Sequence, residues 1–298
     1  MRAFDKSAPI ANVGMGVMGA KVAWACARTG ITTRVFDTDV AKAHAAKETA
    51  LTWSTDKEKD FIAENLHICG TLESALEGVQ LAFENVPERL ELKTDVLAEI
   101  GRILAPGAYM GTNASALTCS PLAAASGRPD LFFNLNFADP RTSRLVELMT
   151  CEATLEETVI FAKNWARAIG MIPIWSRKEQ LGYSFNRLWR VIKAEVLRQI
   201  DQGVTTPHDI DRAWMMAFGT TFGPCALMDK VGLHSVLAVE KIYIDASGDV
   251  EGQPPQTLLD YVERGDLGEV SGKGFYDYPS PAYERDNFME ETDDDAFS

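Results

Sequence analysis

Residues 10–19 of this 298-residue chain read IANVGMGVMG, an apolar run that passes into three glycines with the spacing G-x-G-x-x-G. An apolar helical pattern follows at 20–28, and a β-rich segment at 32–36 ends at Asp37, 23 residues after Gly14. A glycine run between a strand and a helix, with an acidic residue closing the next strand, is typical of a dinucleotide-binding βαβ unit. The stretch therefore predicts a Rossmann-type first domain.

The same motif predicts which atoms bind the cofactor. The first glycine permits a tight turn, the second lets the backbone approach a pyrophosphate, and the third lets helix and strand pack closely. The helix N-terminus offers unpaired N–H groups to the phosphates. An aspartate at the end of the second strand accepts hydrogen bonds from ribose hydroxyls and repels a 2′-phosphate, so NAD(H) is favoured over NADP(H). We expect the cofactor-binding residues here to be Gly14, Gly16, Val17, Met18, Gly19 and Asp37.

The rest of the chain divides into two parts with different periodicity. Up to about residue 175, strand-like segments alternate with helical ones, which favours a parallel, doubly wound sheet. Strands are expected at 79–86, 108–112, 131–137, 145–151 and 171–175, and helices at 39–66, 89–104 and 156–169. Later segments are helical only, at 183–202, 207–218, 228–245 and 255–264. We predict an α/β Rossmann-like domain at 1–179 and an all-α domain at 180–298 that ends in an acidic tail at 290–297.

Composition excludes several classes of protein. The net charge is −14, which argues against a nucleic-acid or anionic-membrane surface. No apolar run approaches the roughly 20 residues that span a bilayer, and the first residues lack a signal-peptide pattern. The five cysteines form no CxxC pair, so neither a metal site nor a disulfide framework is expected. These features predict a soluble cytoplasmic protein.

Six further segments resemble the 3-hydroxyacyl-CoA dehydrogenase family, and they occur in the family's order between residues 8 and 279. In the first domain they are FENVPERLELK at 83–93, TNASAL at 112–117 and LVE at 145–147. In the second they are GYSFNRL at 182–188, which matches the family's GFxxNR, then 223–233, which matches GPFxLxDxVGL, and SGKGFY at 271–276.

The resemblance implies roles for individual residues. Glu88 and Lys93 match the glutamate and lysine that contact the nicotinamide half of the cofactor. Ser115 matches the serine that hydrogen-bonds the substrate oxygen, and Asn186 matches an asparagine beside the substrate. Glu147 matches the glutamate that orients the catalytic histidine. The resemblance also implies a homodimer that forms through the helical domain.

The family's catalytic histidine is missing. The family segment HFFNP reads NFADP at 136–140, so Asn136 stands in place of the histidine. None of His44, His67, His208 and His234 falls at a matching position. An asparagine amide donates a hydrogen bond to a carbonyl oxygen but does not exchange a proton at working pH. Loss of a general base costs about 10²–10⁴ in rate, so the ordinary mechanism cannot run unchanged.

Two arrangements would supply the proton of the reaction without the histidine. Asp139 becomes the acid/base if burial beside the cofactor and Glu147 raises the pKa of its carboxyl. Alternatively Asp139 only caps the turn before Pro140. In that case water or the substrate itself supplies the proton, as an iminium or an enol-forming diketone would allow. Glu147 would then hold the amide of Asn136 in orientation.

The substrate is expected to be small and not linked to coenzyme A. Arg141 and Arg144 follow the site segment, and guanidinium groups bind carboxylates bidentately, although both arginines are equally consistent with a solvated surface. Trp53 and Asp60 stand near the positions where the family's serine and lysine touch coenzyme A. Val270 replaces a lysine near the C-terminal motif. Few cations remain for the phosphates of a coenzyme A thioester.

The sequence therefore predicts an atypical NAD-dependent dehydrogenase or reductase of the 3-hydroxyacyl-CoA dehydrogenase type. Hydride would move between the nicotinamide and a β-hydroxy, β-keto or imine substrate, with Ser115, Asn136 and Asn186 placing the substrate oxygen. The alternative is a family member whose redox step is lost or redirected. Such a protein would be a lyase, a cyclase, an isomerase or a non-catalytic NAD(H)-binding protein.

Overall fold

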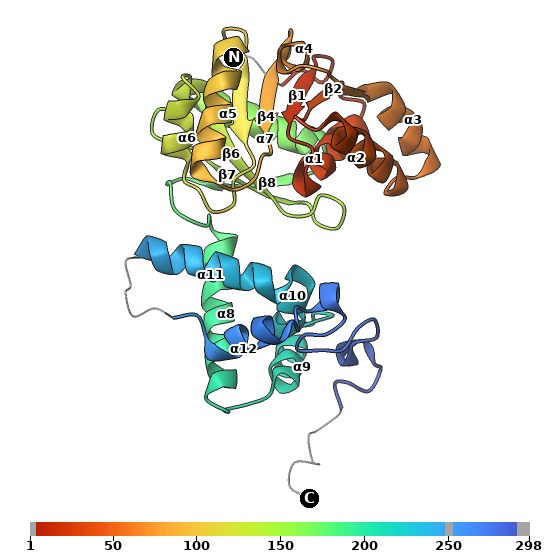
Figure 1. Cartoon of the computed structure of the whole chain (residues 1–298), viewed down its shortest axis with the longest axis vertical. Helices are drawn as coiled ribbons and strands as arrows, with labels where there is room; N and C mark the ends of the chain where they lie inside the picture. The colour runs from red at the N-terminus through yellow and green to blue at the C-terminus, as the bar shows by residue number, and fades with distance from the viewer. Residues whose placement is uncertain (1–3, 248–252, 291–298) are drawn as a thin grey trace, which may run out of the picture. The chain divides into compact units, whose positions relative to one another are not determined.

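The computed structural model describes residues 4–247 and 253–290 (Figure 1). By their internal contacts these residues form two compact units, one ending at Ser184 and one beginning at Phe185. The predicted boundary lay a few residues earlier, at 179/180. The predicted acidic tail lies outside the described residues except for Glu290.

The first unit is built on one eight-stranded sheet with the order β3-β2-β1-β4-β5-β6-β7-β8. The strands are β1 (Ile10–Val13), β2 (Thr33–Phe36), β3 (Leu66–Ile68), β4 (Leu81–Glu84), β5 (Tyr109–Thr112), β6 (Phe132–Phe137), β7 (Leu145–Met149) and β8 (Ile172–Ser176). The strand order reverses between β1 and β4, which is the switch point where doubly wound sheets bind their ligands. The predicted Rossmann-type architecture is therefore confirmed.

One strand pair departs from the predicted parallel sheet. β7 runs antiparallel to β6, whereas the other neighbouring pairs of this sheet are parallel. The connection from β6 to β7 spans only residues 138–144. A parallel pair needs a crossover of a dozen or more residues, so this short connection permits only the antiparallel arrangement.

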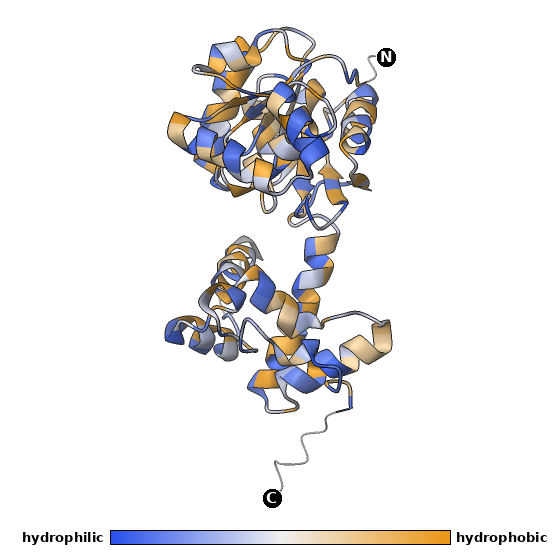
Figure 2. Cartoon of the chain, turned by 90° about the vertical axis from the view of Figure 1, so that its right-hand side faces the viewer, coloured by the Kyte–Doolittle hydropathy of each residue, from blue (hydrophilic) through white to orange (hydrophobic). Residues whose placement is uncertain are grey.

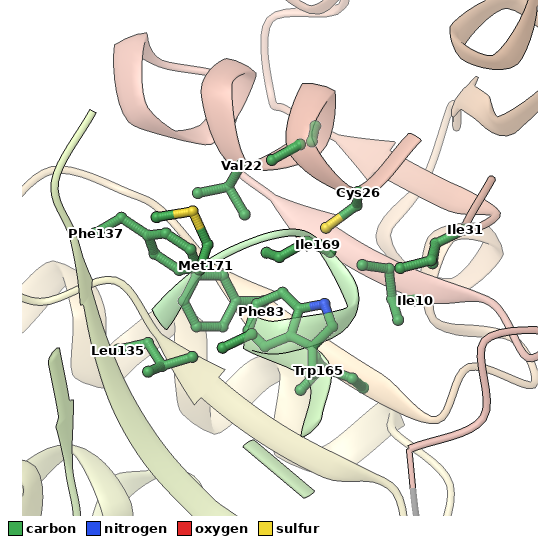
Figure 3. Packing of buried hydrophobic residues seen from close by; sticks show 14 of the residues in the cluster. Ile10, Val22, Cys26, Ile31, Phe83, Leu135, Phe137, Trp165, Ile169 and Met171 are labelled. Atoms are coloured by element: carbon green, nitrogen blue, oxygen red, sulfur yellow. The ribbon is translucent and has the colours of Figure 1, made fainter. Parts of the chain in front are cut away.

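Helices cover both faces of the sheet. The α-helices of the first unit are α1 (Val17–Ala27), α2 (Val40–Thr52), α3 (Asp56–Asn65), α4 (Leu72–Leu76), α5 (Leu90–Ile103), α6 (Cys119–Ala125) and α7 (Glu156–Ala168). The apolar layer under α1, α2, α3 and α7 is distinct from the layer under α4, α5 and α6. In the first of these layers Phe83 packs against Trp165, with ring centroids 4.8 Å apart, and Val22 and Cys26 of α1 point toward them (Figure 3).

In the first unit, one short strand and two short α-helices were not predicted, and one predicted helix is interrupted. The expected helix at 39–66 ends at Thr52, and α3 starts after Thr55, whose side chain and Glu58 form a capping box. β3, α4 and α6 have three to seven residues, too few to establish a clear hydrophobic period.

The second unit is helical, as predicted. It contains α8 (Phe185–Asp201), α9 (Pro207–Phe218), α10 (Pro224–Val231), α11 (Leu233–Ser247) and α12 (Gln256–Arg264). The expected helix at 228–245 is divided at Gly232, whose φ of 90° is not helical. Figure 2 shows hydrophilic and hydrophobic residues interspersed along the helices of both units, as expected for amphipathic helices that each cover a core.

Register brings four chemically important residues to one edge of the sheet. Val13 lies opposite Phe36 of β2 and Glu84 of β4, and Glu84 lies opposite Thr112 of β5. The next residue along each strand is therefore at the same carboxyl edge. These next residues are Gly14, Asp37, Asn85 and Asn113.

Candidate cofactor-binding and active site

Two of the three glycines of the turn, Gly14 and Gly19, are packed too closely to accept side chains. Gly14 has a φ of 92°, and a Cβ atom there would lie 3.0 Å from the backbone of Asn85. A Cβ on Gly19 would lie 1.9 Å from the carbonyl oxygen of Gly14, so only glycine lets α1 approach the turn. Gly16, the N-cap of α1, has open space on its Cβ side. The turn thus leaves its backbone accessible at the start of a helix, where phosphates bind.

Asp37 is the acidic partner of this turn. One carboxylate oxygen accepts a hydrogen bond of 2.7 Å from the amide of Met15, and the other accepts one of 3.0 Å from the amide of Asp39. The ammonium of Lys42 lies 3.9 Å away. Asp37 therefore holds the glycine turn from the end of β2 while its carboxylate remains at the cavity wall.

A chain of asparagine amides lies beneath the turn. The side-chain nitrogen of Asn12 donates to the carbonyl oxygens of Gly14 and Gly19 at 3.2 and 3.3 Å. Its oxygen accepts from Asn85 at 2.9 Å, and Asn85 in turn accepts from Asn113 at 3.1 Å. The amides link the ends of β1, β4 and β5, and they explain why a polar residue interrupts the apolar first strand.

A cavity of about 650 Å³ opens over this edge of the sheet. Most of the sequence-predicted site residues line it, and so do Asn85 and Asn113, which sequence reasoning missed. The predicted residues that line the cavity are Gly14, Gly16, Val17, Met18, Asp37, Glu88, Ser115 and Asn136. Its size and lining fit a dinucleotide with its phosphates at the glycine turn and its ribose at Asp37.

Lys93 lies below the cavity, not in its wall. Its side chain is fully buried, and its ammonium lies 3.0 Å from the carboxylate of Glu84. It also donates to the carbonyl of Asn113 at 3.1 Å and lies 3.7 Å from Glu88. Burial raises the pKa of Glu84. Lys93 does not line the cavity and its ammonium is engaged by these inner groups, so its contact with the cofactor stays a prediction.

Glu88 fastens the loop that carries Ser115. One oxygen of its carboxylate accepts hydrogen bonds from the amides of Ser115 and Ala116, at 2.8 and 2.7 Å. Because Ser115 lines the cavity, Glu88 sets the position of this serine relative to the end of β4.

Asn136 and Glu147 are cross-strand neighbours. They lie directly opposite each other in the antiparallel pair of β6 and β7. Asn136 faces the cavity, whereas Glu147 is 1% exposed. A carboxylate oxygen of Glu147 accepts a hydrogen bond of 3.0 Å from the amide of Ser184. The register supports an orienting role for Glu147.

The expectation that Asp139 has a raised pKa is wrong. Its carboxylate is 2.9 Å from the ammonium of Lys21. It also accepts bidentate hydrogen bonds from the guanidinium of Arg141, the shortest at 2.6 Å. Burial acts to raise the pKa of Asp139, but the hydrogen bonds of Arg141 and Lys21 outweigh it and hold this pKa well below its usual range. Asp139 also accepts from the amide of Arg141 and therefore fits the turn-capping interpretation.

The two arginines predicted to bind a carboxylate already have partners. Arg141 is bound to Asp139, and its guanidinium lies 4.8 Å from the ring centroid of Trp53. Arg144 donates to the carbonyl of Gly170 at 2.9 Å. A substrate carboxylate would have to compete with Asp139 for Arg141.

The remaining predicted residue, Asn186, lies in the first turn of α8 in the second unit. Among the residues that the structure describes, the cavity lining includes no histidine. Those residues also contain no cluster of side chains able to hold a metal ion, and all five cysteines are free.

Comparison with known proteins agrees with this geometry. The model of the 3-hydroxyacyl-CoA dehydrogenase NAD binding domain matches residues 9–180, and that of the C-terminal domain of the same family matches residues 182–278. The chain belongs to the 3-hydroxyacyl-CoA dehydrogenase family. The cofactor of this 3-hydroxyacyl-CoA dehydrogenase homologue is NAD, as the sequence predicted.

Similar proteins include enzymes with and without coenzyme A in their names. A probable 3-hydroxybutyryl-CoA dehydrogenase of Bacillus subtilis is 29% identical, over 89% of this chain and 95% of its own length. The 5-formyl-3-hydroxy-2-methylpyridine 4-carboxylate 5-dehydrogenase of Mesorhizobium japonicum is 25% identical, over 90% of each chain.

Solved structures of the family superpose over nearly the whole chain. A diketoreductase, described as acting on dicarbonyl compounds, has a TM-score of 0.83 and 26% identity, covering 93% of this chain and all of its own. The (S)-3-hydroxybutyryl-CoA dehydrogenase of Ralstonia eutropha has a TM-score of 0.84 and 25% identity, covering 92% of this chain and all of its own. The family models and these relatives place the chain in the NAD-dependent 3-hydroxyacyl-CoA dehydrogenase family.

Proposed function

We propose that this family member transfers hydride between NAD and a small β-keto, β-hydroxy or imine substrate that is not linked to coenzyme A. The observation that carries the proposal is the cavity wall, whose lining includes Asn113, Ser115 and Asn136 and, among the described residues, no histidine. This wall offers hydrogen-bond donors to a substrate oxygen but no imidazole to exchange its proton.

Bound NAD supplies the hydride acceptor or donor of the reaction. The chain supplies orientation: the hydroxyl of Ser115 and the amide of Asn136 donate hydrogen bonds to the substrate oxygen. Donors fixed in this way stabilise the negative charge that develops on that oxygen as the carbonyl carbon is reduced. Glu147, opposite Asn136 in the strand pair, orients the amide.

The proton comes from water or from the substrate itself. Asp139 is unsuited to deliver it because its pKa is held low by Lys21 and Arg141. Enol-forming diketones and iminium ions react without a strong protein acid, so they are the substrates that best suit an amide at position 136.

The names of two relatives support a substrate without coenzyme A. One relative is a diketoreductase that acts on dicarbonyl compounds, and another acts on a substituted pyridine carboxylate. In this chain the guanidinium of Arg141 lies over Trp53, which by the resemblance stands near the position that contacts the nucleotide of coenzyme A, and it is already paired with Asp139.

A substrate panel tests the proposal. Purified protein with NADH is given free β-keto acids, β-diketones, cyclic imines and acetoacetyl-CoA, and the absorbance of the reduced nicotinamide is followed. We expect oxidation of NADH with a diketone or imine and a much lower kcat/KM with the thioester. Acetoacetyl-CoA as the best substrate would contradict the proposal. Tight NADH binding without turnover of any compound would favour the alternative of lost or redirected redox chemistry.

We further infer a homodimer formed through the helical unit and a cytoplasmic location. Large apolar side chains are exposed on its helices, among them Leu188, Val191, Met216 and Phe218. Such a surface is typical of a protein interface. Five free cysteines suit a reducing compartment. Light scattering of the purified protein tests the dimer, which a monomeric mass at micromolar concentration would contradict.

A further inference from the structure

The loop at 113–116, which carries Ser115, is held at each of its four positions by one of three side chains. Lys93 donates to the carbonyl of Asn113, and Glu88 accepts from the amides of Ser115 and Ala116. Between these contacts lies the carbonyl of Ala114, which accepts a hydrogen bond of 2.7 Å from the hydroxyl of Tyr183. Ala114 is completely buried, so no solvent water replaces this donor.

Tyr183 reaches the loop from the segment that precedes α8. It is completely buried in the apolar layer under α4, α5 and α6. Its φ of 53° is left-handed, a conformation that residues other than glycine rarely adopt, and Gly182 before it has a φ of 77°. A strained backbone of this kind persists where surrounding contacts fix it.

Those surrounding contacts connect the segment to the site. The carbonyl of Tyr183 accepts a hydrogen bond of 2.8 Å from the side chain of Gln180. The amide of Ser184 donates to Glu147, the cross-strand neighbour of Asn136. Residues 183 and 184 therefore touch the two supports of the substrate-facing wall, one behind Ser115 and one behind Asn136.

The hydroxyl departs from the family motif that this segment resembles. At this position the family motif GFxxNR has phenylalanine, which fills the same space without a donor, whereas this sequence reads GYSFNR. Burial raises the pKa of Tyr183 well above its ordinary value of 10, so the hydroxyl keeps its proton and serves as a donor throughout the working range.

We propose that the Tyr183 hydroxyl is a positioning residue for the reaction: through the carbonyl of Ala114 it fixes the hydroxyl of Ser115 against the substrate oxygen. This inference rests on the proposed function, in which Ser115 and Asn136 orient the substrate without a histidine. With no imidazole to share the task, accurate placement of the serine carries more of the catalysis.

Tyr183→Phe removes the hydroxyl and restores the family residue while keeping the ring. We expect kcat to fall about 10–100-fold, because small misplacements of orienting groups have effects of this size. NADH affinity is expected to stay within about twofold, since the glycine turn and Asp37 are untouched. In a Ser115→Ala background the same change should have little further effect on kcat, because the two residues act through one contact.

Tyr276→Phe is the matched control. Tyr276 is also buried, and its hydroxyl donates to Asp211 at 2.9 Å within the second unit. We expect this variant to lower the melting temperature without lowering kcat of the folded protein. A purely structural role for Tyr183 would give the same pattern in Tyr183→Phe, and that result would overturn the proposal.

Hydrogen exchange of the peptide covering 113–118 provides a readout that does not depend on turnover. Faster exchange of the Ser115 and Ala116 amides in Tyr183→Phe is expected. Unchanged exchange would overturn the inference even if the wild-type enzyme is active. Absence of wild-type turnover on every substrate would instead contradict the proposed function, and the exchange experiment would still decide whether the hydroxyl holds the loop.

Discussion

At the scale of single residues, the site combines groups that a sequence reveals with groups that it hides. The roles of Gly14 and Asp37 could be predicted because a local motif defines them. The roles of Asn12, Asn85 and Asn113 could not, because each side chain meets its partner only after β1, β4 and β5 are paired. The raised pKa considered for Asp139 is wrong because it weighed burial and left out the hydrogen bonds of Arg141, two residues along the chain, and of Lys21, 118 residues away.

Asp37→Ala should weaken NAD(H) binding about tenfold and reduce discrimination against NADP(H). The carboxylate accepts a hydrogen bond from the glycine turn and is placed to accept others from the ribose, and each such charged bond contributes about 1.5–3 kcal/mol. Fluorescence titration with both reduced cofactors measures the change. Asp39→Ala, which removes only the N-cap of α2, is the control. Unaltered discrimination in Asp37→Ala would refute the ribose role.

Asp139→Asn should leave turnover within a few-fold of the wild type and lower the melting temperature at pH 7. Because the pKa of Asp139 is lower in the folded state than in the unfolded chain, its ion pairs stabilise the fold above about pH 4. This stabilisation disappears as the pH falls further, so the melting temperatures of the two proteins should converge in acid. Abolished turnover with an unchanged melting temperature would restore Asp139 as the acid/base.

At the scale of elements, long segments with a clear period were predicted well and short ones were not. The pattern of β1, the glycine turn and α1 identified the first βαβ unit, and α9 has the predicted bounds. The predicted helix at 39–66 missed the break between α2 and α3, although the capping box of Thr55 and Glu58 is present in the sequence. The direction of β7 follows from the length of one loop.

Lys93→Met tests how α5 is tied to β4 and β5. The change leaves the carboxylate of Glu84 buried without its cation, and breaking a buried pair in this way costs about 3–5 kcal/mol. Urea denaturation measures the loss of stability. The double variant Lys93→Met with Glu84→Gln also removes the carboxylate charge and should recover part of the lost stability. A single variant as stable as the wild type would show that the pair contributes nothing to the fold.

At the scale of the whole molecule, two units follow one another in the order of the 3-hydroxyacyl-CoA dehydrogenase family, and the matched models cover residues 9–278 apart from residue 181. The family, the fold and NAD were predictable from sequence because ordered motifs span both units. Substrate identity was not, because no motif of the sequence fixes which compound the cavity lining around Asn136 binds. No helix among the described residues has the length and apolarity to cross a membrane.

The most direct test of the central claim follows the hydride itself. NADH carrying deuterium at the transferred position of the nicotinamide is incubated with the protein and the best diketone or imine of the panel, and the product is analysed by mass spectrometry. Hydride transfer without a histidine predicts a reduced product that carries the deuterium on the former carbonyl or imine carbon. A product free of deuterium, or bound NADH that is never consumed, would contradict the account.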